Sequence, residues 1–332
     1  MTRRDFFRLA AAMTVTTACG DGGKGGGRGE GDLLPHRKLG RTGASVSIVG
    51  LGGYHMGLQA SADASVRIVR TAIDGGIDFL DNCWDYNDGE SERRMGRALR
   101  DGYRDRVFLM SKVDGRDRDT AARQLDESLQ RLGTDHLDLL QMHEVIRESD
   151  PGRILAPGGA LEALLAARDV GKVRFLGFTG HKSPRWHLAM LDASAQAGFR
   201  WDTVQMPLNV LDAHHDSFEK RVLPRLVSEG IGVIGMKPMA DGRIVYEGIA
   251  SAEECLRYAM SLPVGLTLTG CDALDRVDQA LRAARGFTPM SEDEVNALLA
   301  RTAPAAESGA SERYKTTEEY DGTTQNPEWL GP

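Results

Sequence analysis

Eight short, nearly continuous apolar segments constrain the fold of this chain more than any other feature. They alternate with longer segments of helical periodicity, in which, for example, Leu125, Leu129 and Leu132 recur at helical spacing. The apolar segments begin at Val46, Asp78, Val107, His136, Val173, Asp202, Ile231 and Val264. Strands without polar alternation are typical of sheets buried on both faces, and strand–helix alternation is typical of parallel sheets.

Eight strand–helix units predict a (β/α)8 TIM barrel. The chain has 332 residues, and a barrel of about 250 residues leaves only terminal extensions. An open, doubly wound sheet is the alternative, but no G-x-G-x-x-G segment opens a helix after the first strand. We expect the barrel to span residues 36–288, with a C-terminal helix and tail, residues 289–332, packed on it. In the tail, Tyr314, Tyr320 and Trp329 are the expected anchors.

Composition excludes several classes of protein. The net charge is −7 and the chain has no basic run, so nucleic acid is not an expected partner. No apolar stretch approaches the roughly 20 residues of a membrane-spanning helix. The four cysteines are widely spaced, which fits neither a disulfide framework nor a metal-ligand motif, so no metal is expected.

The first residues are typical of a targeting segment rather than of a fold element. Arg3 and Arg4 precede a short apolar segment, residues 9–18, and the whole resembles a twin-arginine export signal over residues 1–19. Cys19 follows Thr16-Thr17-Ala18, which resembles a lipoprotein box with Thr16 where Leu is usual. An ordinary basic amphipathic N-terminus is the alternative, but it does not account for the paired arginines.

The resemblance to an export signal implies a location and a partner. We expect recognition by the twin-arginine export machinery and a periplasmic or cell-envelope location. Attachment to a membrane is expected only through lipidation at Cys19. Residues 20–35 are Gly-rich with scattered charges, a composition that predicts a flexible linker between the signal and the barrel.

Four side chains capable of proton chemistry fall at three successive expected strand ends. Asp81 ends the second strand with Tyr86 five residues later, Lys112 ends the third, and His143 ends the fourth. Barrel enzymes gather catalytic groups at the carboxyl ends of their strands. Each residue alone has a structural explanation: a helix cap, a loop packing residue, a solvated charge and a hydrogen-bonded core histidine.

Together with their local sequence, the four residues resemble the catalytic tetrad of the aldo/keto reductase family. The motifs are F-L-D-N-x-x-x-Y, S-K-V and L-D-L-L-Q-M-H, and the resemblance runs from about His36 to Leu330. It implies an NAD(P)H-dependent oxidoreductase of the EC 1.1.1 type that reduces aldehydes or ketones to alcohols, or catalyses the reverse. Tyr86 is then the proton donor, and Lys112 is expected to lower the pKa of the phenol from about 10. Asp81 would orient Lys112, and His143 would hydrogen-bond the substrate oxygen.

Cofactor residues are implied by the same resemblance, with departures. The family holds the nicotinamide amide with a Ser-Asn pair and a Gln, where this chain has Thr179, Gly180 and Gln205. His181 is a candidate replacement for the missing amide, and Leu208 is a candidate for the platform on which the family often stacks a Tyr.

The remaining cofactor residues follow the seventh and eighth strands. Lys237 and Gly242 match the stretch beside the pyrophosphate, although a strand-end charge explains Lys237 equally well. Gly270 opens the region of the adenosine phosphate. Asp272 there favours the free 2′-hydroxyl of NAD(H), whereas Arg276 and the family habit favour NADP(H), so use of both cofactors is expected. Asp272 also suits a helix cap, a role that is compatible with the first.

The substrate is not specified by sequence beyond a small carbonyl compound. Tyr54, His55 and Trp84 are the candidate pocket residues, with Cys83 as a weaker one. A second hypothesis is a redox sensor or regulatory subunit that binds the cofactor with negligible turnover. The intact tetrad argues against it.

Overall fold

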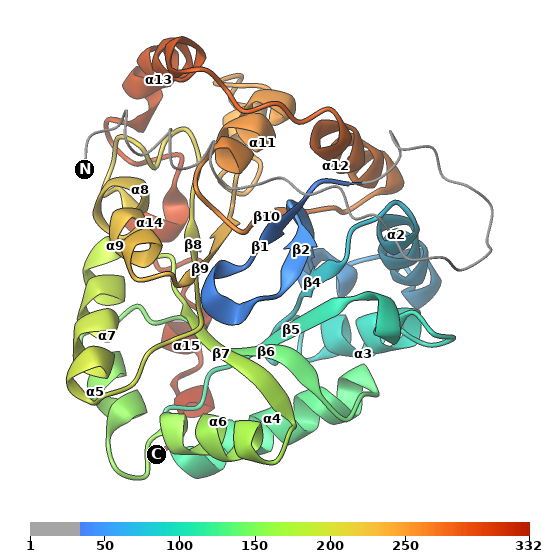
Figure 1. Cartoon of the computed structure of the whole chain (residues 1–332), viewed down its shortest axis with the longest axis vertical. Coiled ribbons are helices and arrows are strands. Elements are labelled where there is room, and N and C mark those ends of the chain that lie inside the picture. The colour runs from blue at the N-terminus through green and yellow to red at the C-terminus, as the bar shows by residue number, and fades with distance from the viewer. Residues whose placement is uncertain (1–33) are drawn as a thin grey trace.

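The computed structural model describes residues 34–332, so the twin-arginine segment, Cys19 and most of the expected linker lie outside the described residues. Eight parallel strands close into a barrel in the order β10-β3-β4-β5-β6-β7-β8-β9 (Figure 1). The barrel strands are β3 (Val49–Gly52), β4 (Phe79–Asp81), β5 (Phe108–Val113), β6 (Leu137–Met142), β7 (Val173–Thr179), β8 (Thr203–Pro207), β9 (Gly232–Met236) and β10 (Leu266–Gly270). The predicted (β/α)8 barrel is therefore confirmed.

Helices form the outer layer around this barrel (Figure 1). Those that follow the strands are α2 (Ala62–Asp74), α3 (Glu90–Ala98), α4 (Arg118–Leu132), α5 (Ser149–Leu155), α6 (Ala160–Asp169), α7 (Pro184–Gln196), α8 (Phe218–Arg221), α9 (Leu223–Ser228), α10 (Arg243–Tyr246), α11 (Ala252–Ser261) and α12 (Leu274–Arg285). Local sequence sets their ends. The Asp117 side chain, for example, accepts hydrogen bonds from the first turn of α4, and Gly133, at φ 64°, ends that helix in the left-handed conformation that glycine adopts most easily.

The first predicted strand is divided in two. Its beginning forms β2 (Ser45–Ser47), which pairs antiparallel with β1 (His36–Lys38), and only its second half is the barrel strand β3. This hairpin lies across the near end of the barrel in Figure 1. Leu39 is fully buried there, and the backbone N–H of Arg41 donates to the Gly230 carbonyl at 2.8 Å. Apolar continuity alone did not reveal the break, because both halves are buried.

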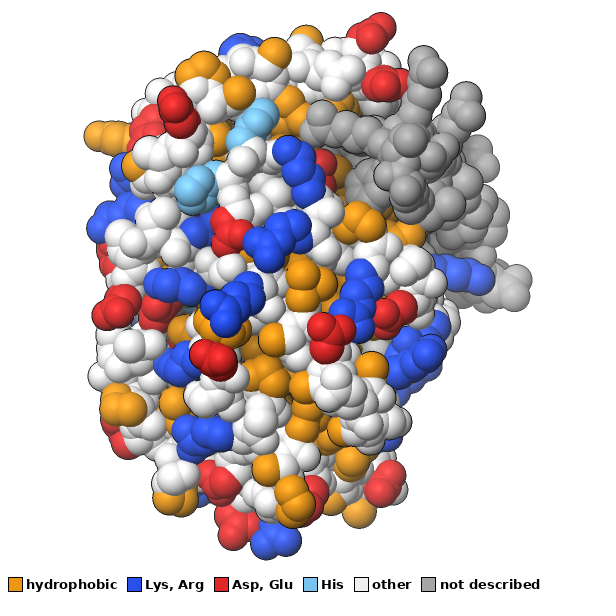
Figure 2. All heavy atoms as spheres, turned by 90° about the vertical axis from the view of Figure 1, so that its left-hand side faces the viewer, with side chains coloured by type: hydrophobic (Ala, Val, Ile, Leu, Met, Phe, Trp, Pro, Cys, Tyr) orange, Lys and Arg blue, Asp and Glu red, His pale blue; other side chains and the backbone are white. Residues whose placement is uncertain are grey.

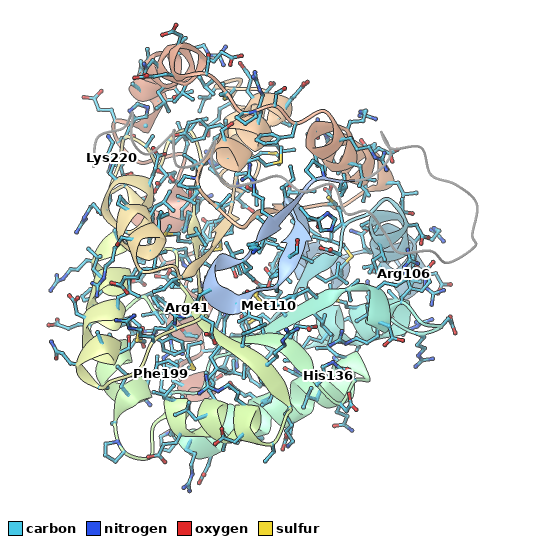
Figure 3. The ribbon with its side chains drawn as sticks, in the orientation of Figure 1. Arg41, Arg106, Met110, His136, Phe199 and Lys220 are labelled. Atoms are coloured by element: carbon cyan, nitrogen blue, oxygen red, sulfur yellow. The ribbon has the colours of Figure 1, made fainter. Side chains whose placement is uncertain are left out.

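The core has two parts. One lies inside the barrel and is built from Leu39, Val46, Phe79, Phe108, Met110, Leu139, Ile234, Leu266 and Leu268. Figure 3 shows the labelled Met110 near the middle of the ring, with Arg106 and Lys220 at the periphery. The larger part lies between the strands and the helices. Because both faces of each strand are buried, the strands carry the continuous apolar segments seen in the sequence.

A C-terminal extension follows the barrel. It consists of α13 (Glu292–Ala306), α14 (Arg313–Thr316), α15 (Gly322–Gln325) and the 3-10 helix η5 (Pro327–Leu330). α13 begins later than the segment expected from Pro289, because Ser291 and Glu294 form a capping box. The tail from residue 313 returns to the barrel, where the Gln124 amide donates to the Trp329 carbonyl at 2.9 Å.

The outer surface mixes both signs of charge. On the face shown in Figure 2, which is the left-hand side of Figure 1, acidic and basic side chains are interspersed. Within residues 34–332, none of the helices combines the length and the apolarity that a membrane crossing requires.

Candidate active site

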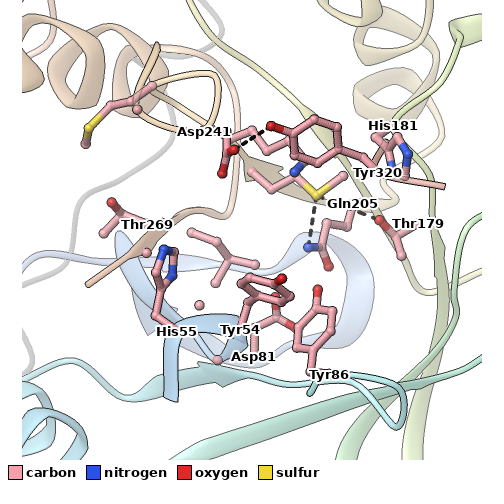
Figure 4. A pocket seen from close by; sticks show the side chains of 18 of the residues that line it. Tyr54, His55, Asp81, Tyr86, Thr179, His181, Gln205, Asp241, Thr269 and Tyr320 are labelled. Atoms are coloured by element: carbon pink, nitrogen blue, oxygen red, sulfur yellow. Dashed lines mark hydrogen bonds between the residues drawn. The ribbon is translucent and has the colours of Figure 1, made fainter. Parts of the chain in front are cut away.

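A large pocket opens where the barrel strands end at their carboxyl sides (Figure 4). Its volume of about 1020 Å³ lies at the upper end of the range for small-molecule and cofactor sites. Residues of seven barrel strands contribute to its wall, and the C-terminal tail adds Glu319, Tyr320, Gly322, Gln325, Asn326 and Trp329. The barrel and the tail therefore form this pocket together.

The structure brings the four predicted tetrad residues together in this pocket. Lys112, on β5, is 1 % exposed and forms an ion pair with Asp81 at the end of β4. Its Nζ also donates to the Asn82 carbonyl at 2.8 Å and to the Tyr86 hydroxyl at 3.2 Å. Asp81 pairs in register with Met110 of the neighbouring strand, two residues before Lys112, and the loop after β4 brings the Tyr86 hydroxyl to the Lys112 ammonium.

The expected lowering of the Tyr86 pKa is wrong. Burial, assisted by the negative charges of Asp81, Asp85 and Glu144, raises the pKa of Tyr86 well above its ordinary value. The single ammonium of Lys112 does not reverse this effect, because Asp81 neutralises it.

His143 follows β6 and is 7 % exposed. Its Nδ1 lies 2.9 Å from Oδ1 of Asp114, and its ring meets the Tyr86 ring edge-on with centroids 5.9 Å apart. The other ring nitrogen, Nε2, has no hydrogen bond to the described residues, and His143 lines the pocket. This arrangement presents Nε2 to a ligand beside the Tyr86 hydroxyl.

The expected nicotinamide side is formed by neighbouring strand ends. Thr179 on β7 pairs in register with Gln205 on β8, and the Gln205 amide donates to the Met236 sulfur at 3.3 Å (Figure 4). Leu208 is not the apolar platform, because it is fully buried in the outer core beside Gly235. Met236, at the end of β9, lines the pocket instead.

Gly180 departs from the family pattern for a steric reason. A Cβ at this position would lie 2.5 Å from the Val145 carbonyl oxygen and 3.0 Å from the His187 ring, so the family's Asn does not fit this backbone. His181 lines the pocket, but its Nε2 is bound to Asp321 at 3.0 Å. His181, the residue expected to replace the family's Asn amide, is therefore already hydrogen-bonded to the tail through its Nε2.

Lys237, Gly242 and Gly270 all line the pocket, as expected of residues along a dinucleotide. The Lys237 ammonium lies 5.1 Å and 4.9 Å above the ring centres of Tyr314 and Tyr320, and the described residues offer it no ion pair. Burial lowers the pKa of Lys237. At Gly270 a Cβ would approach the His55 ring to 2.7 Å, so the backbone of residue 270 and the His55 ring leave no room for a side chain between them.

Asp272 and Arg276 are exposed at the edge of the same pocket. The expectation that Asp272 caps the following helix is wrong: the N-cap of α12 is Ala273, and no side chain caps it. The chain turns into the helix one residue later than the sequence suggested, so the Asp272 carboxylate makes no capping hydrogen bond.

Of the candidate substrate residues, Tyr54 and His55 line the pocket and Trp84 does not. The Trp84 indole donates to Glu127 at 2.7 Å, and its ring packs edge-on against Trp329 of the tail at 5.8 Å. Trp84 therefore supports the pocket wall from behind, while Trp329 forms it. Cys83 is fully buried and also lies outside the pocket wall.

Sequence reasoning missed the carboxylates that surround His143. Asp85, Asp114 and Glu144 come from three different segments and meet at this histidine. Asp114 lies two residues after Lys112 at a strand end, which was a usable signal. Met236 and Tyr320 were likewise missed as pocket residues, because a methionine at a strand end and a tyrosine in a tail suggest packing first.

A closed (β/α)8 barrel that brings a Tyr, a Lys, a His and an Asp into one pocket at its strand ends defines a class of barrel enzymes that act on small molecules. The chain belongs to the aldo/keto reductase family, whose sequence model matches residues 48–249.

Individual relatives agree with this assignment. The chain is similar to the uncharacterized oxidoreductase YrpG of Bacillus subtilis, with 31% identity over 63% of this chain and 68% of the relative. It is 26% identical to L-glyceraldehyde 3-phosphate reductase of Escherichia coli, over 84% and 78% of the two chains.

Solved structures of the family share the fold. Aldo-keto reductase AKR11C1 from Bacillus halodurans, in its holo form, superimposes with a TM-score of 0.68 at 22% identity, covering 81% of this chain and 96% of that one. An aldo-keto reductase from Klebsiella pneumoniae in complex with NADPH gives 0.66 at 25% identity, covering 80% and 94%.

Proposed function

We propose that this protein reduces aldehydes or ketones to alcohols, or catalyses the reverse, with NADPH or NADH as the hydride source. The observation that carries the proposal is the contact of the Lys112 ammonium with both Asp81 and the Tyr86 hydroxyl, inside a pocket that His143 also lines. Two donors then face one substrate oxygen, the Tyr86 hydroxyl and Nε2 of His143. Such preorganised donors stabilise negative charge as it develops on that oxygen.

Tyr86 is the proposed proton donor, even though its pKa is raised. An alkoxide formed by reduction of a carbonyl is a far stronger base than any phenolate, so transfer from a high-pKa phenol is still downhill. Lys112 then stabilises the phenolate that is left, and Asp81 holds Lys112 in place. The proton is replaced from solvent before the next turnover.

The residues at the strand ends fit a nicotinamide dinucleotide. Oε1 of Gln205 is buried and has no hydrogen-bond partner among the described residues, so it can accept from a carboxamide N–H. Gly242 and Gly270 leave the backbone accessible beside the pyrophosphate path, and the Lys237 ammonium supplies a positive charge there. When bound, the reduced nicotinamide supplies the hydride.

Two opposite charges at the pocket edge account for the proposed use of both dinucleotides. Asp272 would repel the 2′-phosphate of NADPH, whereas Arg276, four residues later on α12, would attract it. Neither charge is buried, so neither dominates.

The test is oxidation of NADPH and of NADH, followed at 340 nm, with a panel of small aldehydes, ketones and quinones, and with identification of the alcohol product. Turnover that depends on the carbonyl compound supports the proposal. Tight cofactor binding with no turnover across the panel would instead support the redox sensor or regulatory subunit.

We also propose, from residues outside the described part of the chain, that the protein is exported by the twin-arginine route to the periplasm or cell envelope. Arg3 and Arg4 carry this proposal. The route transports folded proteins, which suits a barrel that acquires its dinucleotide before export. Cys19 is the proposed site of a lipid anchor.

A further inference from the structure

One ring nitrogen of His143, Nδ1, faces two carboxylates. Its Nδ1 lies 2.9 Å from Oδ1 of Asp114 and 3.6 Å from Oδ1 of Asp85. The Asp114 side chain is fully buried, and the Asp85 side chain is 11% exposed. The two carboxylates come from the β5 strand end and from the loop after β4, so the fold, rather than one flexible segment, holds them at this ring.

Neither carboxylate is fully satisfied by hydrogen bonds. Oδ1 of Asp85 and Oδ2 of Asp114 are buried and accept none from the described residues. A buried carboxylate with missing donors is costly unless a positive charge lies beside it. The ring of His143 is in the right place to carry that charge, because its Nδ1–H points at Asp114.

We propose that Asp114 and Asp85 are positioning residues that keep His143 doubly protonated, so that an imidazolium Nε2–H, and not a neutral one, faces the substrate oxygen. The inference rests on the proposed carbonyl reduction for its catalytic consequence, but the charge of the ring is a property of the protein alone. Charge-assisted hydrogen bonds are roughly twice as strong as neutral ones, so this donor stabilises a developing alkoxide more effectively.

The surrounding charges support an imidazolium. Burial by itself would lower the pKa of His143, but Asp85, Asp114 and Glu144 together raise it to about 9. The nearby cation Lys112 is paired with Asp81, so it opposes this effect little.

Two further charged groups lie close to the strand end. Arg116 donates to the backbone carbonyls of His143 and Glu144 and is paired with Asp150. On the neighbouring β7 side, His181 is bound to Asp321. Arg116 is therefore committed to an acidic partner of its own, and burial lowers the pKa of His181, which disfavours its charged form.

The protons and electrons of the reaction balance under this proposal. The carbonyl carbon gains a hydride and is reduced, the nicotinamide is oxidised, and the oxygen gains the proton of Tyr86. His143 acts as a charged hydrogen-bond donor to the same oxygen.

The same cluster has side chains of the kind that bind metal ions. Cys83, Asp85, Asp114 and His143 each offer a ligand atom within 4.8 Å of the others. Burial raises the pKa of the Cys83 thiol well above its ordinary value, and its sulfur lies 3.7 Å from the Lys112 carbonyl oxygen. Metal binding would have to displace the protons of this thiol and of His143, so bound Zn²⁺ is a contrary outcome of the test below.

The deciding experiment is a histidine titration by ¹H–¹³C NMR on the mature chain, without substrate or cofactor. The His143 resonance is assigned by its loss in His143→Gln. We expect it to titrate at about pH 9 in the wild type. We expect Asp114→Asn and Asp85→Asn each to move the midpoint down by about 1 to 3 units. Asp88→Asn, which removes an exposed carboxylate of the same loop, should leave it unchanged.

The pH profile of kcat/KM then gives an independent readout. Its alkaline limb should move to lower pH by the same amount in Asp114→Asn, while the dissociation constant of the cofactor stays the same. A wild-type midpoint near 6.5, or midpoints that both Asn variants leave unchanged, would overturn the proposal. So would one equivalent of tightly bound Zn²⁺ that is lost in Asp114→Asn. Absence of turnover with every carbonyl compound would refute the proposed function and leave the titration result standing.

Discussion

The carboxylate of Glu144 accepts two hydrogen bonds from Thr323, one from its backbone N–H at 2.8 Å and one from its hydroxyl. A third comes from the backbone N–H of Gly322 at 2.9 Å. Glu144 directly follows His143 and has a φ of 45°, in the left-handed region that few non-glycine residues adopt. The tail that covers the pocket is thus bound to the strand end that carries His143.

Glu144→Gln should destabilise the protein by about 2 kcal/mol at pH 7, because hydrogen bonds to a buried charge are lost. The C-terminal tail should then exchange amide hydrogens faster than the barrel does. Urea unfolding and hydrogen exchange of residues 313–331 measure the two effects. Glu148→Gln, at an exposed position with no side-chain cap contact, is the matched control. Equal stability of the two variants would contradict this role of Glu144.

The effect of Glu144 should depend on pH. Burial raises its pKa, but His143, His181 and Thr323 outweigh this effect and lower the pKa below the ordinary value of 4.5. Its contribution is therefore fully present above pH 4.5 and is lost as the pH falls through the folded pKa. The stability difference between wild type and Glu144→Gln should shrink in that acidic range.

Lys112→Met should cost about 3 kcal/mol of stability, because it leaves Asp81 buried and uncompensated. Asp81→Asn combined with Lys112→Met should recover most of that loss, since no buried charge then remains. Neither variant should reduce carbonyl compounds. Chemical unfolding of Lys112→Met, Asp81→Asn and the double variant gives the free energy of interaction between the two side chains. A double variant as unstable as Lys112→Met would argue that packing, and not charge, is lost.

Asp272→Ser should raise the ratio of kcat/KM for NADPH over NADH by about tenfold, equivalent to roughly 1.4 kcal/mol, because a charge that repels the 2′-phosphate is removed. Asp278→Ser, on the same helix but outside the pocket, is the control. Steady-state kinetics with both cofactors decides it. An unchanged ratio would leave Asp272 without a role in selection, since it does not cap the helix.

The barrel could be predicted from sequence because each strand is buried on both faces and so carries a readable apolar segment. The division of the first segment into β2 and β3 could not, since Ile48 at the break is as buried as its neighbours. The tetrad was recognisable from local motifs at strand ends. Two features depend on how separate segments pack. One is the set of carboxylates around His143, and the other is that Trp329, rather than the expected Trp84, lines the pocket. No single stretch of sequence specifies such contacts.

Arg3→Lys combined with Arg4→Lys should retain the full-length protein in the cytoplasm, because the twin-arginine machinery recognises the pair itself. Cell fractionation and immunoblotting measure the location. Arg8→Lys, outside the pair, is the control and should be exported normally. Normal export of the double variant would contradict the proposed route.

The most direct measurement of the central claim is the rate of NAD(P)H-dependent carbonyl reduction by Tyr86→Phe, together with its cofactor affinity. The hydroxyl acts in the transition state, so kcat should fall by several orders of magnitude while the cofactor dissociation constant stays nearly unchanged. Tyr103→Phe, which removes a hydroxyl bound to Asp74 outside the pocket, should keep full activity. Substantial turnover by Tyr86→Phe would contradict the assignment of Tyr86 as the proton donor.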